Sequence, residues 1–67
     1  MKAQAAQSWL TTAELAQRLS LATGTLENWR IRGHGPAWVR LSGKRGPVRY
    51  RLSDVLKWEE KQTGSRQ

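Results

Sequence analysis

Apolar residues recur with helical spacing in the first third of the chain. Leu15, Ala16 and Leu19 share one face of a helix. Thr11 and Glu14 have the spacing of a capping box, in which the Thr side chain accepts the Glu backbone N–H and the Glu side chain accepts the Thr backbone N–H. The sequence therefore predicts a helix that begins after Thr11 and ends near Leu19.

A second helical pattern follows a break at residues 20–22. Leu26 and Trp29, three positions apart, lie on the same side of this helix. Gly33 marks its end, so the predicted helix covers residues 23–32. Two short helices separated by a three-residue break have the spacing of a helix-turn-helix.

The apolar pattern then changes from a helical period to a period of two. Residues 38–41 and 48–52 alternate between apolar and polar side chains, as strands with one buried face do. The connecting segment 42–47, SGKRGP, contains two glycines and a proline, which is typical of a hairpin loop. We expect one face of this hairpin to cover the helices and the other to face solvent. The expected inward set is Val39, Leu41, Val48, Tyr50 and Leu52. The expected outward set is Arg40, Arg49 and Arg51, with Lys44 and Arg45 at the tip.

A third helix is predicted to begin at Ser53, which is a favourable N-cap residue. Asp54 follows in the first turn, where a negative charge favours the helix dipole. Val55 and Trp58, three apart, face inward. The order helix, helix, hairpin, helix predicts a mainly α fold with a small β-hairpin, a winged helix-turn-helix, over residues 9–61. Residues 1–8 and 62–67 are predicted to be tails.

Composition limits what so small a domain can do. The 67 residues include no Cys and one His, so we expect no disulfide, no metal site and no cofactor. The chain also has a single Asp, so it cannot assemble a catalytic set of a nucleophile, a base and a residue that orients the base. We therefore do not expect it to be an enzyme. Four tryptophans supply bulk for a core. Trp29 and Trp58 are predicted to lie in the core and Trp9 to cover it, whereas base stacking on single-stranded nucleic acid is the alternative for Trp29, Trp38 and Trp58.

The charge balance indicates a polyanionic partner. Twelve Lys and Arg against five Asp and Glu give a formal charge of +7 and an isoelectric point near 11.3. A membrane surface would require a basic amphipathic helix, but five of these charges lie in the predicted hairpin, from Arg40 to Arg51. No apolar run reaches the roughly 20 residues that span a bilayer, and no secretory signal is visible. We therefore expect a cytoplasmic, nucleoid-associated protein that binds double-stranded DNA and no membrane.

Several segments together resemble the MerR-like winged helix-turn-helix group, which includes phage excisionases and AlpA-type prophage regulators. The matching segments are LTTAELAQRL, TLENWR, RGHGP and VRYRLSDV, followed by Trp58. The resemblance implies that the second helix enters the major groove and that the wing follows the backbone or the minor groove. It also implies dimers or cooperative arrays on DNA, with an integrase as a possible partner. The implied role is either a recombination directionality factor or a transcriptional regulator.

The candidate DNA-binding residues lie on the second helix and the hairpin. Asn28 can read adenine and Glu27 can accept a hydrogen bond from cytosine, whereas Arg30 can reach a phosphate. The alternative for Glu27 and Asn28 is an ordinary solvated helix face, and for the hairpin a solvated basic strand. The helix set is Thr23, Gly24, Thr25, Glu27, Asn28, Arg30 and Arg32. The hairpin set is Arg40, Lys44, Arg45, Arg49 and Arg51. A basic protein-interaction module, or the DNA-recognition part of a phage packaging complex, is the competing function.

Overall fold

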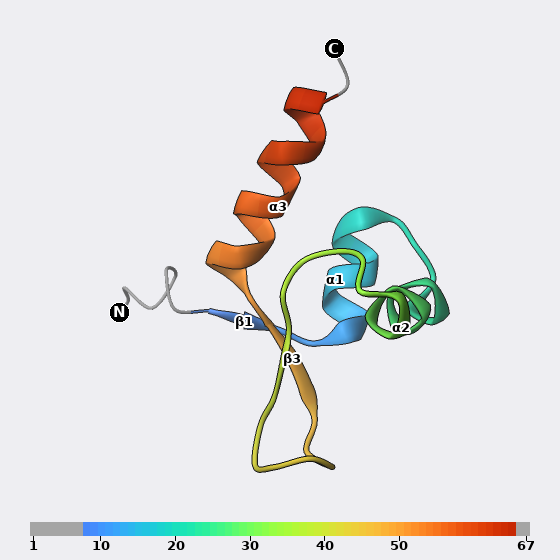
Figure 1. The fold of residues 1–67 in the computed structure, drawn as a ribbon, viewed down its shortest axis with the longest axis vertical. Coiled ribbons are helices and arrows are strands. Elements are labelled where there is room, and N and C mark those ends of the chain that lie inside the picture. The colour runs from blue at the N-terminus through green and yellow to red at the C-terminus, as the bar shows by residue number, and fades with distance from the viewer. Residues whose placement is uncertain (1–7, 66–67) are drawn as a thin grey trace.

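The computed structural model describes residues 8–65, which combine three helices with a small antiparallel sheet, as the sequence predicts for a winged helix-turn-helix (Figure 1). The long third helix and the tip of the hairpin extend in opposite directions from the centre of the domain. The elements are β1 (Trp9–Leu10), α1 (Thr12–Leu19), α2 (Thr23–Arg32), β2 (Val39–Arg40), β3 (Val48–Arg51) and α3 (Leu52–Ser65).

Helix α1 begins with the capping box that the sequence predicts. The Glu14 backbone N–H donates to the Thr11 hydroxyl at 3.0 Å, and the Thr11 backbone N–H donates to Glu14 Oε1 at 2.9 Å. These two bonds satisfy backbone donors that the first turn leaves without helical partners. The helix ends at Ser20, which adopts a left-handed conformation with φ of 60°. The predicted bounds of this helix are confirmed.

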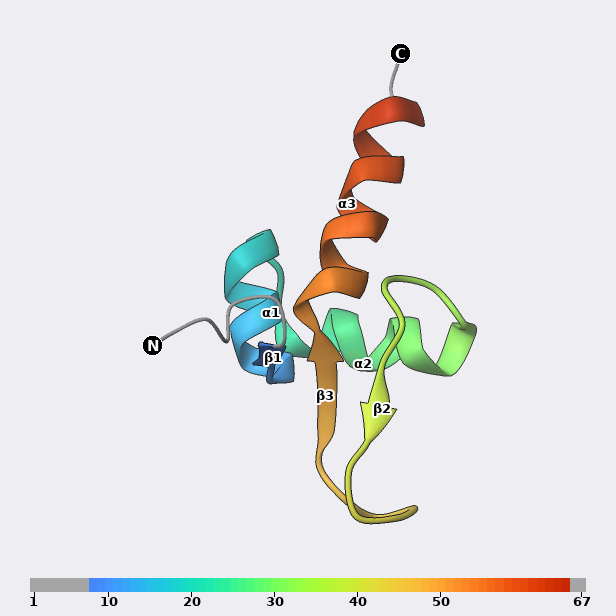
Figure 2. The same ribbon diagram turned by 90° about the vertical axis from the view of Figure 1, so that its left-hand side faces the viewer.

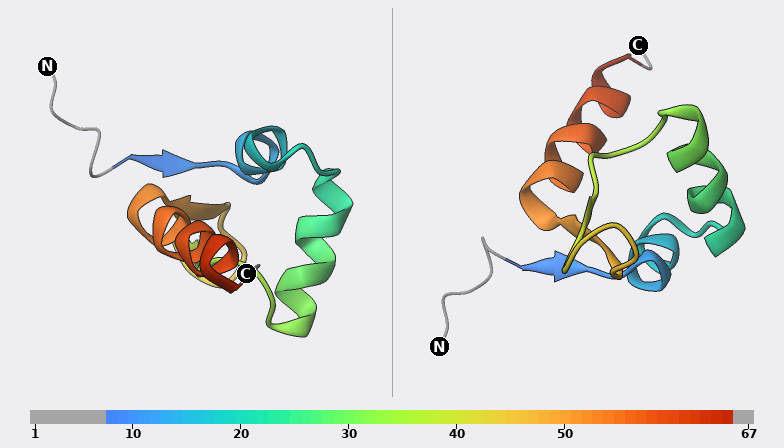
Figure 3. Two further views of the ribbon diagram at one scale, coloured as in Figure 1. Left: turned by 90° about the horizontal axis from the view of Figure 1, so that it is seen from above. Right: turned by 60° about the horizontal axis from the view of Figure 1, so that its bottom comes forward.

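Helix α2 follows after the short turn and lies across α1 (Figure 3). It covers residues 23–32 as predicted and ends at Gly33, where φ is +75°. A left-handed residue at this position is a common helix terminus, and glycine adopts it without steric cost. The helix-turn-helix spacing read from the sequence is therefore present in the structure.

The sheet has a third strand that the sequence did not predict. Strand β3 lies in the middle, between β1 and β2, and pairs with both in antiparallel fashion. In the β1–β3 pair, Leu10 stands opposite Tyr50 and Trp9 stands opposite Arg51. Trp9 therefore shares a sheet face with Arg51, whose guanidinium carbon lies 4.9 Å from the Trp9 ring centroid. The prediction that Trp9 covers the core is wrong, because the core lies on the other face.

The side chains of the first hairpin strand face the opposite way from the prediction. Val39 stands opposite Arg49, and Arg40 stands opposite Val48. Residues directly opposite in an antiparallel pair project from the same face. Val39 and Leu41 are accordingly exposed, each at 39%, and Arg40 shares the face of Val48 instead of that of Arg49. The alternation within each strand is as predicted. The hairpin loop sets how the two strands pair, and a shift of one residue moves the inward side chains of a strand to its outer face.

Helix α3 begins one residue earlier than predicted and runs further. Its first residue is Leu52, so Ser53 lies inside the helix and is not its N-cap. The Leu52 backbone N–H donates to the Ser8 carbonyl oxygen at 2.9 Å, which continues the β1–β3 pairing into the helix start. The helix runs through Ser65, past residue 62, where the C-terminal tail was predicted to start; residues 1–7 of the predicted N-terminal tail lie outside the described residues. Within residues 8–65, no helix is long and apolar enough to cross a membrane.

The core joins both helices of the helix-turn-helix to the sheet and α3. Its fully buried members are Leu15, Leu26, Tyr50 and Val55, with Ala16 and Val48 nearly so. Leu10, Leu19 and Trp29 pack partly buried against this cluster. Because the central strand supplies Val48 and Tyr50, the hairpin is fixed to the helices by packing.

Trp29 and Trp58 extend the packing between α2 and α3. Their ring centroids lie 5.6 Å apart, with the ring planes inclined at 52°. Gly35 lies so close to the Trp29 ring that an added Cβ would stand 2.6 Å from a ring carbon, and its φ is +82°. The first contact packs α2 against α3 and the second packs the loop after α2 against the Trp29 ring, and both agree with a packing role for the two tryptophans.

An ion pair connects α1 to α3 on the surface. Arg18 Nε and Nη2 donate to the two carboxylate oxygens of Glu59 at 2.7 and 2.9 Å. This bidentate hydrogen bonding favours the charged form and lowers the pKa of Glu59 from its ordinary value.

Candidate nucleic-acid interface

The outer side of α2 presents most of the predicted base-reading residues to solvent. Leu26, Trp29 and Arg30 face the protein, and the opposite side of the helix is exposed. Thr25 is half-buried between the two sides and is less accessible than the sequence suggested. The exposed residues of α2 are Thr23, Gly24, Glu27, Asn28, Ile31 and Arg32.

The β2–β3 hairpin extends beside this helix. Figure 2 shows α2 lying across the base of the hairpin, with the hairpin tip pointing away from α3. A helix of this kind beside a hairpin is the arrangement of a recognition helix and its wing. Of the two predicted sets, Glu27 and Arg30 of the helix line one hollow with Arg40 of the hairpin, whereas Arg51 lies over the Trp9 ring on the outer face of the sheet.

Arg30 connects the helix to the wing and faces inward. Its Nη1 donates to the Tyr50 hydroxyl at 2.8 Å and to the Thr12 hydroxyl at 3.2 Å. Its guanidinium carbon also lies 5.8 Å from the centre of the Trp38 ring. These contacts give Arg30 a structural role across α1, α2 and β3, which the sequence analysis missed. A phosphate contact from this residue stays a prediction.

The hairpin arginines differ in how freely they can reach a ligand. Arg49 is half-buried, and its Nη1 donates to the Val48 carbonyl oxygen at 2.8 Å. Arg40 is exposed and donates to the Gly46 carbonyl oxygen at 3.1 Å. Arg51 lies over the Trp9 ring, on the outer face of the sheet.

Lys44 and Arg45 occupy the exposed tip of the hairpin, as predicted. The loop reaches this position through a compact turn, in which the Gly46 backbone N–H donates to the Gly43 carbonyl oxygen at 3.1 Å. A Cβ at Gly46 would overlap the Leu41 carbonyl oxygen, so only glycine fits there. The two cations are therefore carried at the far end of a loop whose backbone is tightly turned.

A hollow of about 290 Å³ separates α2 from β2. Its charged lining consists of Glu27 and Arg30 from the helix side and Arg40 from the strand. Two further lining residues, Ile31 and Trp38, were not among the predicted site residues, although they are 84% and 37% exposed. The helical period places Ile31 among the polar residues of α2. An apolar residue on that side could have identified Ile31 as a candidate site residue from the sequence.

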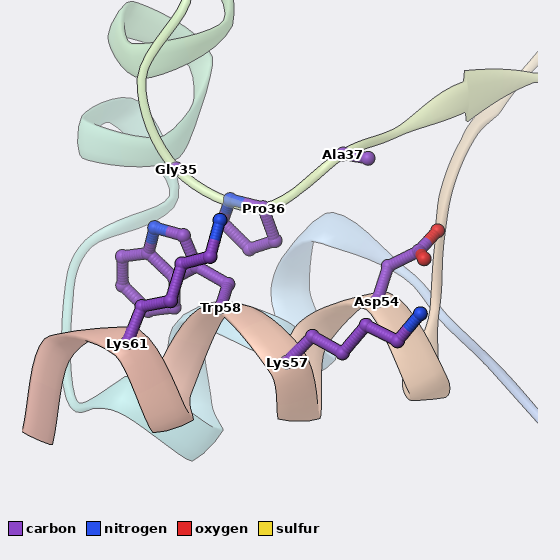
Figure 4. Close-up of a pocket in the computed structure, with 7 residues that line it drawn as sticks. All are labelled: Gly35, Pro36, Ala37, Asp54, Lys57, Trp58 and Lys61. Atoms are coloured by element: carbon purple, nitrogen blue, oxygen red, sulfur yellow. The ribbon is translucent and has the colours of Figure 1, made fainter. Parts of the chain in front are cut away.

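A second hollow, of about 240 Å³, lies between α3 and the loop that follows α2 (Figure 4). Pro36 and Trp58 line it together with two lysines, Lys57 and Lys61, that the sequence analysis did not single out. Figure 4 shows the Lys61 side chain beside Trp58 and reaching toward Pro36, whereas Lys57 extends below Asp54. The basic surface of the domain is therefore not confined to α2 and the wing.

These features define a class of protein: a helix-turn-helix DNA-binding domain with a basic wing. The chain belongs to the helix-turn-helix domain family, whose match covers residues 9–63. No protein of curated function and no solved structure matches the chain.

Proposed function

We propose that this protein binds specific duplex sites as a recombination directionality factor or transcriptional regulator of the excisionase and AlpA type, within the MerR-like winged helix-turn-helix group. The main support is the position of the exposed polar side of α2 beside the basic hairpin. The hollow between them is lined by Glu27, Arg30, Ile31, Trp38 and Arg40. The family match supports DNA as the partner. The resemblance described for the sequence supports the finer assignment.

In the proposed complex α2 enters the major groove and the wing contacts the neighbouring backbone or minor groove. Asn28 and Glu27 are exposed on the helix and can reach base edges, where amide and carboxylate groups discriminate between bases. Lys44 and Arg45 at the wing tip supply phosphate contacts, which position the protein without reading sequence. The function consists of binding and needs no catalytic group, metal or cofactor.

Cooperative binding of several copies is part of the proposal. A single small module buries only about 600–1,000 Å² on DNA, and α2 has only ten residues. One copy therefore reads few base pairs, and two or more copies on neighbouring sites would supply the missing specificity. In a recombination role these copies would act beside an integrase.

Selection of binding sites from a random duplex library, followed by titration of Asn28→Ala, tests this function. We expect Asn28→Ala to lose about 1–3 kcal/mol on the selected site while binding to random duplex barely changes. Gln17→Ala removes an exposed amide from α1 and is the matched control. Titration of an acidic protein of equal charge runs in parallel. Tighter binding to that protein than to any duplex would support the rival function, a basic protein-interaction module.

A further inference from the structure

Ile31 is the most exposed of the large hydrophobic residues in the described part of the chain. Its exposure is 84%, against 47% for Leu56 and 41% for Trp9, which follow it. The core contains Leu26 from the same helix and does not use Ile31. Packing within the domain therefore does not explain this side chain.

The position of Ile31 on α2 is that of the proposed base-reading residues. Gly24, Asn28 and Ile31 are spaced by four and three residues, so they form one stripe along the exposed side of the helix. A Cβ at Gly24 would meet nothing within 4 Å, so the stripe is open to solvent at this end too. The apolar side chain thus stands in line with the amide of Asn28.

The surroundings of Ile31 suit a nucleotide. The hollow that it lines also holds Arg40, whose guanidinium carbon lies 5.7 Å from the centre of the Trp38 ring. Arg40 is exposed and can donate hydrogen bonds to a phosphate from the side of the wing. An apolar group on the helix and a cation on the wing therefore line the same hollow, so that a base edge and a neighbouring phosphate could be contacted together.

We propose that Ile31 reads a thymine by contact with its C5-methyl group in the major groove. The inference rests on the proposed duplex-binding function and names a base that one of its residues recognises. Among the groups that base pairs display in the major groove, the thymine methyl is the apolar one, and apolar side chains discriminate it. Asn28 then reads a neighbouring base by hydrogen bonding, while Ile31 adds a contact that needs no polar partner.

Replacement of thymine by uracil tests the inference, because uracil pairs identically and lacks only the methyl group. Each thymine of the selected site is replaced singly, and the dissociation constant is measured for the wild type and for Ile31→Ala. We expect at least one replacement to weaken the wild type about fourfold, the effect of one buried methyl group. The same replacement should leave Ile31→Ala unchanged. Leu56→Ala, which shortens an exposed aliphatic side chain outside the hollow, should retain the full thymine preference.

The possible failures are distinguishable. A library that yields no preferred duplex contradicts the proposed function itself. A preferred site at which every uracil replacement is neutral, or equally harmful to Ile31→Ala, overturns the thymine contact and leaves the proposed function intact. Loss of self-association in Ile31→Ala, measured by sedimentation with the thymine preference retained, would also overturn it and assign the residue to a contact between copies.

Discussion

Arg30 Nη1 donates a 2.8 Å hydrogen bond to the hydroxyl of Tyr50, and this bond joins the proposed recognition helix to the central strand of the wing. Tyr50 is 1% exposed, so its hydroxyl has little access to water. The bond fixes how the helix and the wing are placed relative to each other, which is the property a two-part DNA interface needs.

Tyr50→Phe should destabilise the domain by about 1.5–3 kcal/mol, the usual contribution of a hydrogen bond to a charged group. The aromatic ring stays in the core, so the loss reports on the hydroxyl alone. The measurement is urea unfolding of the variant and the wild type. Thr12→Val, which removes the acceptor of the longer 3.2 Å bond from Arg30, is the comparison and should cost less. An unchanged midpoint for Tyr50→Phe would show that the bond does not form in solution.

Trp29→Ala should cost about 3 kcal/mol of unfolding free energy, because the ring packs against the core and against Trp58. That is a large part of the stability of a domain this small. Trp9→Ala provides the matched control, since Trp9 lies on the outer face of the sheet with 41% exposure. Thermal melts of the two variants should differ by many degrees. Similar melts would mean that Trp29 is not part of the packing.

The double variant Lys44→Ala, Arg45→Ala should bind all duplex sequences more weakly and with less dependence on salt. Each lost phosphate contact flattens the slope of log K against log salt by about 0.9. We choose these residues because they are exposed at the hairpin tip, whereas Arg49 donates to its own strand. The variant Lys57→Ala, Lys61→Ala removes the same charge from α3 and should change the slope less. Equal slopes in the two double variants would contradict phosphate contact by the wing.

Gly24→Ala should raise the melting temperature and weaken binding to the selected site. Alanine is favoured over glycine inside a helix by up to about 1 kcal/mol, and the new Cβ would meet nothing within 4 Å beyond its chain neighbours and its own helix backbone. Because the fold gives no reason for glycine, we ascribe it to close approach of DNA to the start of α2. A stabilised variant with unchanged affinity would contradict that explanation.

The Arg18–Glu59 ion pair should make part of the stability depend on pH. The bond from Arg18 lowers the folded-state pKa of Glu59. The contribution of the ion pair to the free energy of unfolding is therefore fully present above the unfolded-state pKa of Glu59. It is lost as the pH falls through the lowered folded-state pKa. We expect the melting temperature of the wild type to exceed that of Glu59→Gln at neutral pH, and the difference to shrink in acid. A difference that stays constant down to the acid limit would count against this ion pair.

The local elements of the fold could be predicted from the sequence because neighbouring residues determine them. The capping box of Thr11 and Glu14, the break after α1 and the glycine end of α2 all appear where the pattern placed them. The alternation of Val48 and Tyr50 with arginines likewise predicted the strand that is β3. The exposed position of Asn28 and Glu27 on α2 follows from the same periodicity.

Contacts between distant segments were decided only by the tertiary structure. The two residues of β1 are too few to show a strand pattern, and they form a strand because β3 offers a free edge. The start of α3 at Leu52 depends on the carbonyl of Ser8, and the face that carries Arg40 depends on the register that the hairpin loop imposes. The inward role of Arg30 depends on hydroxyl groups from two other elements, at Thr12 and Tyr50. A single sequence shows the period of each segment but not the offset between segments, and that offset determines which side chains meet.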